Sequence, residues 1–335
     1  MTQMRYSDKL VQRINELYHD YAGKDYSQSH PEIFEEEVFR WKYLSSRYLS
    51  TLAHPIRILD IGSGTGFVAG IICQALKEED TIILSDISQE MVDLAKRKFE
   101  GERYGPHLKF VKIAVHTPYR ISFESHSIDV ITINSVLHHV QDVQTFLNEV
   151  DRLLRPGGLL LICHEPNQKF FDNSLPYWAY TFASFLDLAP ANLSRATRIA
   201  ALELSRRIGV ERFARRVYYL MGSAREKRVS GIAQSSAQAL MLADINRKLI
   251  AEHLISTPLV LDVAKLVDIR ATSGFNPSEL VPSYEILRLD TYDHLYKFKT
   301  LHRRNAFVKL FDSALSKMLP NEGANFCVVL KKPAI

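Results

Sequence analysis

The chain has 335 residues, of which 46% are apolar and 24% are charged, and its formal net charge is +4. This composition is typical of a soluble globular protein and excludes a disordered linker or a collagen-like fibre. At roughly 100–200 residues per domain, the length allows two domains or one enlarged domain. Cys73, Cys163 and Cys327 are far apart and form no CxxC pair. We therefore expect free thiols, with neither a metal site nor a disulfide framework.

Two features of the sequence bear on location and charge. The N-terminal residues MTQMRYSDKL carry charges and no apolar core, so the sequence predicts no secretory signal and a cytoplasmic location. Basic residues concentrate between 195 and 228, where ten basic and three acidic side chains give a local charge of +7. The basicity is therefore a local patch, and Arg212, Arg215 and Arg216 share one face of a predicted helix in it.

The predicted elements change character along the chain. Residues 1–53 have helical spacing of their apolar side chains. From residue 54, short apolar runs alternate with helical stretches, which predicts a parallel sheet covered on both faces. The predicted strands are 56–61, 81–86, 108–113, 128–134 and 159–163, and the predicted helices are 67–76, 89–99 and 143–154. Residues 155–158 are expected to form a turn, residues 168–282 are mostly helical, and strand-like segments at 284–292 and 324–332 close the chain.

A glycine-rich loop, LDIGSGTG at residues 59–66, follows the first predicted strand. Its glycines allow a tight turn and let a ligand lie against bare backbone. A dinucleotide-binding fingerprint would place its third glycine at Phe67, which is bulky. Asp60 would repel a pyrophosphate but attract a cationic amino-acid group, and Asp86 at the second strand end could accept both ribose hydroxyls. A ligand with these parts is S-adenosylmethionine.

Four segments resemble, in order, the successive motifs of class I S-adenosylmethionine-dependent methyltransferases. They are LDIGSGTGF, SDISQEMVDLAKRKF, IDVITINSVLHHVQD and LLRPGGLLLICHEPN, and the resemblance covers about residues 55–167. It implies an α/β fold with a Rossmann-like, seven-stranded, mostly parallel sheet, whose last strand is antiparallel, and with helices on both faces. The two C-terminal strand candidates supply the missing pair.

The resemblance also implies which residues contact the cofactor. The glycines lie near the methionine part, Asp60 near its amino group, and Asp86 on the ribose. The full implied set is Asp60, Gly62, Ser63, Gly64, Gly66, Asp86, Ile87, Met91 and Asn134. Many members carry an acidic or amide residue after the third strand that holds the adenine amino group. Here residues 112–116 are KIAVH, so adenine contact is left to backbone groups or His116.

Histidines and a glutamate follow the fourth and fifth predicted strands, where catalytic groups of an open α/β sheet gather. A general base helps if the methyl acceptor is a hydroxyl or a protonated amine. His138 is the first candidate for this base, with Glu165 and His164 as alternatives. We expect His139 to be structural, and each of the others could equally pack or cap a helix.

The sequence favours some acceptors over others. The residues after the fourth strand, Asn134 to Leu137, lack the Asn/Asp-Pro-Pro-aromatic motif, and no cysteine follows a proline, so we expect no DNA substrate. The resemblance implies a small-molecule or lipid-like acceptor. An RNA methyltransferase and a catalytically silent adenosylmethionine-binding interaction module remain alternatives. The methylated atom and the oligomeric state are left open.

The expected organisation has three parts. Residues 1–53 form a helical segment over the cofactor site, residues 54–167 and 283–335 form the core, and residues 168–282 form a helical substrate cap. The basic face at Arg212, Arg215 and Arg216 could meet a membrane surface or an acidic carrier, or could be an ordinary solvated helix face.

Overall fold

The computed structural model describes residues 6–23, 31–102, 105–113, 119–172, 236–259, 267, 269, 273–294 and 314–334. Most of the predicted cap, including Arg212, Arg215 and Arg216, lies outside the described residues. The chain divides into two compact units. One comprises Met1–Asn167, Ile245–Asp290 and Asn325–Ile335, and the other comprises Gln168–Asp244 and Thr291–Ala324.

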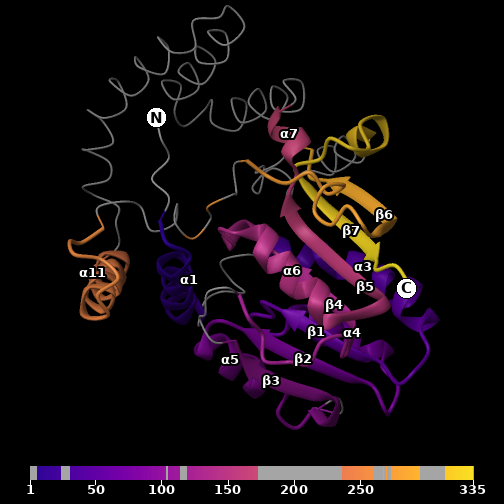
Figure 1. Ribbon diagram of the computed structural model, residues 1–335, viewed down its shortest axis with the longest axis horizontal. Helices are drawn as coiled ribbons and strands as arrows, with labels where there is room; N and C mark the ends of the chain where they lie inside the picture. Colours follow the sequence, from indigo (N-terminus) through magenta and orange to yellow (C-terminus); the bar gives the residue numbers. More distant parts are fainter. Residues whose placement is uncertain are drawn as a thin grey trace, which may run out of the picture. The chain divides into compact units, whose positions relative to one another are not determined.

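Within the described residues, seven strands form one sheet in the order β3-β2-β1-β4-β5-β7-β6 (Figure 1). The strands are β1 (Arg57–Ile61), β2 (Thr81–Asp86), β3 (Leu108–Lys112), β4 (Ile128–Asn134), β5 (Leu154–Pro166), β6 (Glu285–Tyr292) and β7 (Asn325–Lys331). Neighbouring strands among the first five pair in parallel, whereas β7 pairs with β5 antiparallel. The predicted Rossmann-like, mostly parallel sheet is therefore confirmed.

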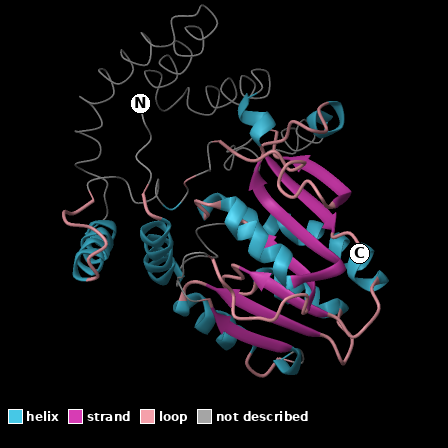
Figure 2. Cartoon of the chain, viewed as in Figure 1, coloured by secondary structure: helices cyan, strands magenta, loops and turns pink. Residues whose placement is uncertain are grey.

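Helices pack against this sheet, α6 on β5 and α5 on β2 and β3 (Figure 2). The described helices are α1 (Asp8–Ala22), α3 (Pro31–Tyr48), α4 (Phe67–Ile72), α5 (Gln89–Phe99), α6 (Val143–Leu153), α7 (Gln168–Asp172) and α11 (Ser236–Ala251). Short 3-10 turns are η2 (Leu49–Thr51), η3 (Cys73–Ala75), η4 (Gly105–His107) and η5 (Leu137–His139). Side chains of Ser88 and Asp142 accept hydrogen bonds at the starts of α5 and α6, which explains where both helices begin. None of the described helices is both long and apolar enough to cross a bilayer.

The core of the fold lies between the central strands and α6, which crosses the near face of β4 and β5 in Figure 1. The first six residues of β4 are all buried, as expected for a strand covered on both faces. Against these strands α6 packs the apolar face that carries Phe146, Leu147 and Val150. This packing fixes the ends of the central strands, which is where the site is found.

Two details of β5 differ from the sequence analysis. The strand begins at Leu154, because Leu154 pairs with Ile128 across a register shift. The predicted turn at 155–158 therefore lies inside the strand. Cys163 is the cross-strand partner of Cys327 on β7, and the two are joined in a disulfide. The expectation of free thiols is wrong for this pair, because the sequence alone did not reveal the antiparallel register of β7.

Candidate functional site

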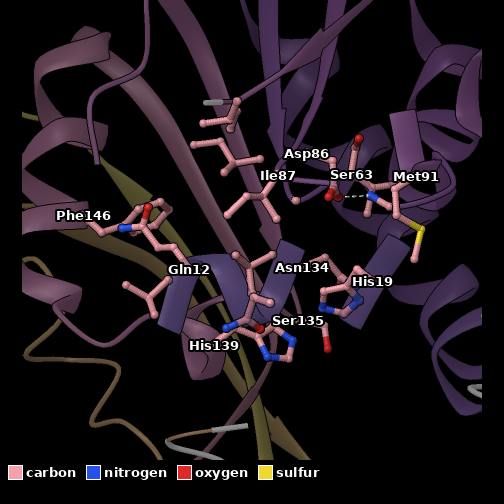
Figure 3. Close-up of a pocket in the computed structure, with 18 of the residues that line it drawn as sticks. Gln12, His19, Ser63, Asp86, Ile87, Met91, Asn134, Ser135, His139 and Phe146 are labelled. Carbon is pink, nitrogen blue, oxygen red and sulfur yellow. Dashed lines mark hydrogen bonds between the residues drawn. The ribbon is translucent and has the colours of Figure 1, made fainter. Parts of the chain in front are cut away.

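A cavity opens beside the carboxyl ends of the central strands, where ligands bind in open α/β sheets (Figure 3). Its lining includes predicted cofactor residues, namely Gly62, Ser63, Gly64, Asp86, Ile87, Met91 and Asn134. The other residues of its lining are Gln12, Asn15, His19, Ile61, Thr65, Phe67, Val68, Ile113, Tyr119, Ile121, Ser135, Val136, His139, Val140 and Phe146. Asp60 and Gly66 are not part of this lining, and neither are His138, His164 and Glu165.

The glycine loop keeps its backbone bare toward the cavity. Gly62 has a φ of +67°, and a Cβ there would come within 2.4 Å of Val136 Cγ2. Gly64 has a φ of +51°, and a Cβ there would meet no heavy atom within 4 Å. A side chain at Gly62 would thus clash, and one at Gly64 would project into open space. The loop therefore needs glycine both to adopt its conformation and to leave room for a ligand.

Asp86, at the end of β2, is held by backbone amides of two loops. Its Oδ2 accepts a hydrogen bond from Gly64 N at 2.9 Å (dashed in Figure 3), and its Oδ1 accepts from Ser88 N at 2.9 Å. Burial raises the pKa of the Asp86 carboxyl to about 6, and these hydrogen bonds oppose the rise. The carboxylate is thus fixed at the cavity wall with a defined direction.

Asp60, at the end of β1, has one oxygen satisfied and one not. Its Oδ1 accepts a hydrogen bond from Thr132 Oγ1 at 2.7 Å. Its Oδ2 is buried and has no hydrogen-bond partner among the described residues. Burial raises the pKa of the Asp60 carboxyl to about 7, and the charge of Asp86 adds to this rise. A buried, unpaired carboxylate oxygen fits a ligand that brings a cationic donor.

Asn134 is positioned by a helix that is distant in sequence. The indole Nε1–H of Trp41 on α3 donates to Asn134 Oδ1 at 3.0 Å, and the Trp41 side chain is fully buried. One turn earlier on the same helix, the buried Glu37 carboxylate lies 3.6 Å from His164 Nδ1. The helix α3 is therefore tied to the carboxyl ends of both β4 and β5. In the sequence, Trp41 is only one of the helically spaced apolar residues of the segment 1–53, and no local pattern indicates its contact with Asn134.

Two of the predicted catalytic residues lie together. His138 Nδ1 is 2.9 Å from Glu165 Oε2, and Glu165 is fully buried. Glu165 also accepts hydrogen bonds from the backbone N–H groups of Val136 and Leu137, at 2.5 and 2.7 Å, and from His138 N at 3.2 Å. A carboxylate can only accept, so the neutral His138 ring carries its proton on Nδ1 and leaves Nε2 as its basic nitrogen.

His139, which we expected to be structural, forms part of the cavity wall (Figure 3). Its Nδ1 lies 2.9 Å from the carbonyl oxygen of Val267, and its ring packs edge-on against the ring of His19 with centroids 5.4 Å apart. The ring of His138 lies 4.0 Å from that of His139, centroid to centroid. The sequence does not show which of the two adjacent histidines faces the cavity, because neighbouring side chains of a 3-10 turn point in different directions.

The comparisons with known proteins agree with this geometry. Residues 59–162 match the family model described as a methyltransferase domain. Residues 59–162 are a class I S-adenosylmethionine-dependent methyltransferase domain. S-adenosylmethionine is the cofactor of this methyltransferase class. The glycine loop, the bare backbone at Gly64 and the unpaired oxygen of Asp60 fit that cofactor.

Similar proteins include enzymes of several kinds. The chain is 31% identical to a highly reducing polyketide synthase of Pyrenophora dematioidea, over 34% of this chain and 5% of the synthase. It is 28% identical to the ubiquinone/menaquinone biosynthesis C-methyltransferase UbiE of Edwardsiella ictaluri, over 51% of this chain and 66% of that enzyme. A crystal structure of a SAM-dependent methyltransferase from Aquifex aeolicus matches with 22% identity and a TM-score of 0.33, covering 41% of this chain and 68% of that chain. The chain thus spans less than two thirds of the length of these first two curated relatives.

Replacing Asp60 by Asn should stabilise the cofactor-free protein at pH 8. A carboxyl with a raised pKa holds its proton more tightly when folded, so its contribution to stability falls as pH rises from about 4 to 7. Asn carries no charge, so the free energy of unfolding of Asp60→Asn should exceed that of the wild type by about 1–4 kcal/mol at pH 8, since one pKa unit corresponds to about 1.4 kcal/mol. Thermal melts at pH 5 and pH 8 test this, with the exposed Glu79→Gln as control. A wild type at least as stable as Asp60→Asn at pH 8 would contradict it.

Replacing Trp41 by Phe should weaken binding of S-adenosylhomocysteine by about threefold to tenfold, because Asn134 loses its hydrogen-bond donor. The smaller ring also lowers stability, so the affinity is measured by calorimetry well below the melting temperature. A double-mutant cycle separates the two effects. In an Asn134→Ala background, Trp41→Phe should no longer change the affinity. An equal loss in both backgrounds would mean that Trp41 acts only through packing.

Proposed function

We propose that this chain transfers the methyl group of S-adenosylmethionine to a small-molecule acceptor whose nucleophilic atom must lose a proton. The observation that carries the proposal is a pair of buried carboxylates next to the bare glycine loop: Asp60 lies two residues before Gly62, and Asp86 accepts from Gly64 N. Relatives named as C-methyltransferases support a carbon acceptor. A carbon must be deprotonated before it can attack, which agrees with a base near the site.

Each residue of the cavity would hold one part of the cofactor. Asp60 pairs its free oxygen with the cationic amino group, and Asp86 accepts the ribose hydroxyls. Gly62 and Gly64 allow the methionine part to lie against the loop, and Ile87 packs on the adenine. Bound S-adenosylmethionine supplies an electrophilic methyl group, so this chain needs only to position the acceptor and take its proton.

His138, whose ring lies 4.0 Å from that of the cavity-lining His139, centroid to centroid, would be the base that takes this proton. The Glu165 carboxylate orients the ring and stabilises the imidazolium that forms, as a carboxylate does for histidine in other catalytic pairs. Glu165 acts only through His138 and is a positioning residue. The Nδ1 of His139 lies against the carbonyl oxygen of Val267, whereas that of His138 lies against a carboxylate, which stabilises an imidazolium more strongly. His139 would instead shape the wall against which the acceptor lies.

Replacing Asp86 by Ala should weaken binding of S-adenosylhomocysteine by about 1.5–3 kcal/mol, because two ribose hydroxyls lose a charged acceptor. Calorimetry measures the loss, with exposed Glu79→Gln as the control that removes a charge elsewhere. The wild type should bind S-adenosylhomocysteine and S-adenosylmethionine but not NAD. Tight NAD binding without adenosylmethionine binding would overturn the proposed function.

Replacing His138 by Ala should lower turnover by roughly 10²–10⁴ while cofactor binding persists, because the acceptor loses its base. The acceptor is first found by screening small phenols, quinols and β-dicarbonyl compounds for methylation. His139→Ala is the matched control and should change KM more than kcat. If turnover falls with His139→Ala and not with His138→Ala, the assignment of the base is wrong. Binding of cofactor without methylation of any acceptor would favour a catalytically silent binding module.

A further inference from the structure

The helix α1 presents two buried amide side chains to the cofactor cavity. Gln12 and Asn15 are three residues apart, so they lie on one face of the helix, and both belong to the cavity lining. Gln12 is 8% exposed and Asn15 is 5% exposed. Buried amides nearly always have all of their hydrogen bonds formed, so an unpaired atom on either side chain calls for a partner.

Each of these two amides has one buried polar atom that makes no hydrogen bond of ordinary geometry within the described residues. Asn15 Nδ2 donates to the carbonyl oxygen of Val11 at 2.9 Å, which fixes the orientation of the amide and turns Oδ1 away from that bond. Asn15 Oδ1 has no hydrogen-bond partner among the described residues. Gln12 Nε2 likewise makes no hydrogen bond of ordinary geometry there, although the Tyr119 hydroxyl lies close to it. The same face of α1 thus offers a ligand in the cavity one acceptor, Asn15 Oδ1, and one donor, Gln12 Nε2.

Polar contacts place this face over the ends of β2 and β3. Glu16, next to Asn15, forms an ion pair with Lys112 at the end of β3, with 2.6 Å between Oε1 and Nζ. Asp20 accepts a hydrogen bond from Ser88 Oγ just after β2, at 2.6 Å. The helix therefore crosses the side of the cavity where Asp86 stands. The sequence from the end of β3 onward, KIAVH at residues 112–116, contains no carboxylate or side-chain amide.

We propose that Asn15 and Gln12 recognise the adenine of the cofactor, with the Asn15 Oδ1 atom accepting from its exocyclic amino group and the Gln12 Nε2 group donating to its N1. The inference rests on the proposed function, which supplies an adenosine ligand for the cavity. Adenine presents a donor and an acceptor side by side on this edge, and the two amides present the complementary acceptor and donor. The helix α1 thereby performs the task that a residue after β3 performs in many related domains.

This arrangement selects adenine over hypoxanthine. Hypoxanthine carries an acceptor oxygen in place of the amino group and a hydrogen on N1. Its O6, an acceptor, would face the acceptor Asn15 Oδ1, and its N1–H, a donor, would face the donor Gln12 Nε2. A site built to form hydrogen bonds rejects a ligand that leaves its buried groups unpaired much more strongly than an apolar site does.

Calorimetry with S-adenosylhomocysteine and S-inosylhomocysteine tests the inference. The wild type should bind the adenosyl compound at least about tenfold more tightly. Asn15→Leu, which keeps an apolar side chain of similar size, should weaken adenosyl binding and reduce the preference. Gln12→Glu should favour the inosyl compound, because a carboxylate accepts from the N1–H of hypoxanthine. The exposed Lys9→Gln on the same helix should change neither affinity.

The outcomes separate the inference from the proposed function. Asp86→Asn should weaken both compounds equally, because both carry the same ribose. If the wild type binds both compounds equally, or if Asn15→Leu and Gln12→Glu keep the wild-type preference, the inference is wrong and the proposed function stands. If the wild type binds neither compound, the proposed function fails and the inference fails with it. Circular dichroism confirms that each variant is folded before its affinities are compared.

Discussion

Glu165 leaves the end of β5 with a side chain that has no contact with water, and its oxygens accept from three consecutive backbone amides of the loop after β4. Loss of the carboxylate would remove an acceptor from all three amides at once, and the loop would lose the contact that holds it to β5. Asp86 does the same for the glycine loop through Gly64 N. The shape of the cavity therefore depends on carboxylates at strand ends that hold the neighbouring loops.

The third carboxylate of this edge is different, because part of it is left without a partner. Asp60 keeps one oxygen buried and unpaired, and the folded chain bears the cost of this at neutral pH. Better local stability would require a neutral side chain or an internal donor. The neutral side chain would remove the charge that fits a cationic ligand, and the donor would occupy the oxygen that such a ligand needs. Functional sites commonly keep such unfavourable groups, and the well-packed core between β4, β5 and α6 tolerates this one.

Much of the fold could be predicted from sequence, because its signals are local. The apolar runs of β1, β2 and β4, the loop at Gly62 to Gly66 and the caps at Ser88 and Asp142 depend on neighbouring residues alone. The supports of the site could not be predicted, because they join distant segments. The hydrogen bond from Trp41 to Asn134 spans 93 residues, and the two amides of α1 reach the cavity only because Lys112 and Ser88 anchor that helix. His138 and Glu165 were each identified, but their contact depends on the register shift after Cys163.

The raised pKa values of Asp60 and Asp86 make the cavity a small proton buffer near neutrality. A cation that enters beside these carboxyls favours their charged forms, so its arrival expels protons into the solvent. The heat of binding then contains the ionisation heat of whichever buffer takes up those protons. Tris and phosphate, whose ionisation heats differ, would therefore give different apparent enthalpies for one and the same association.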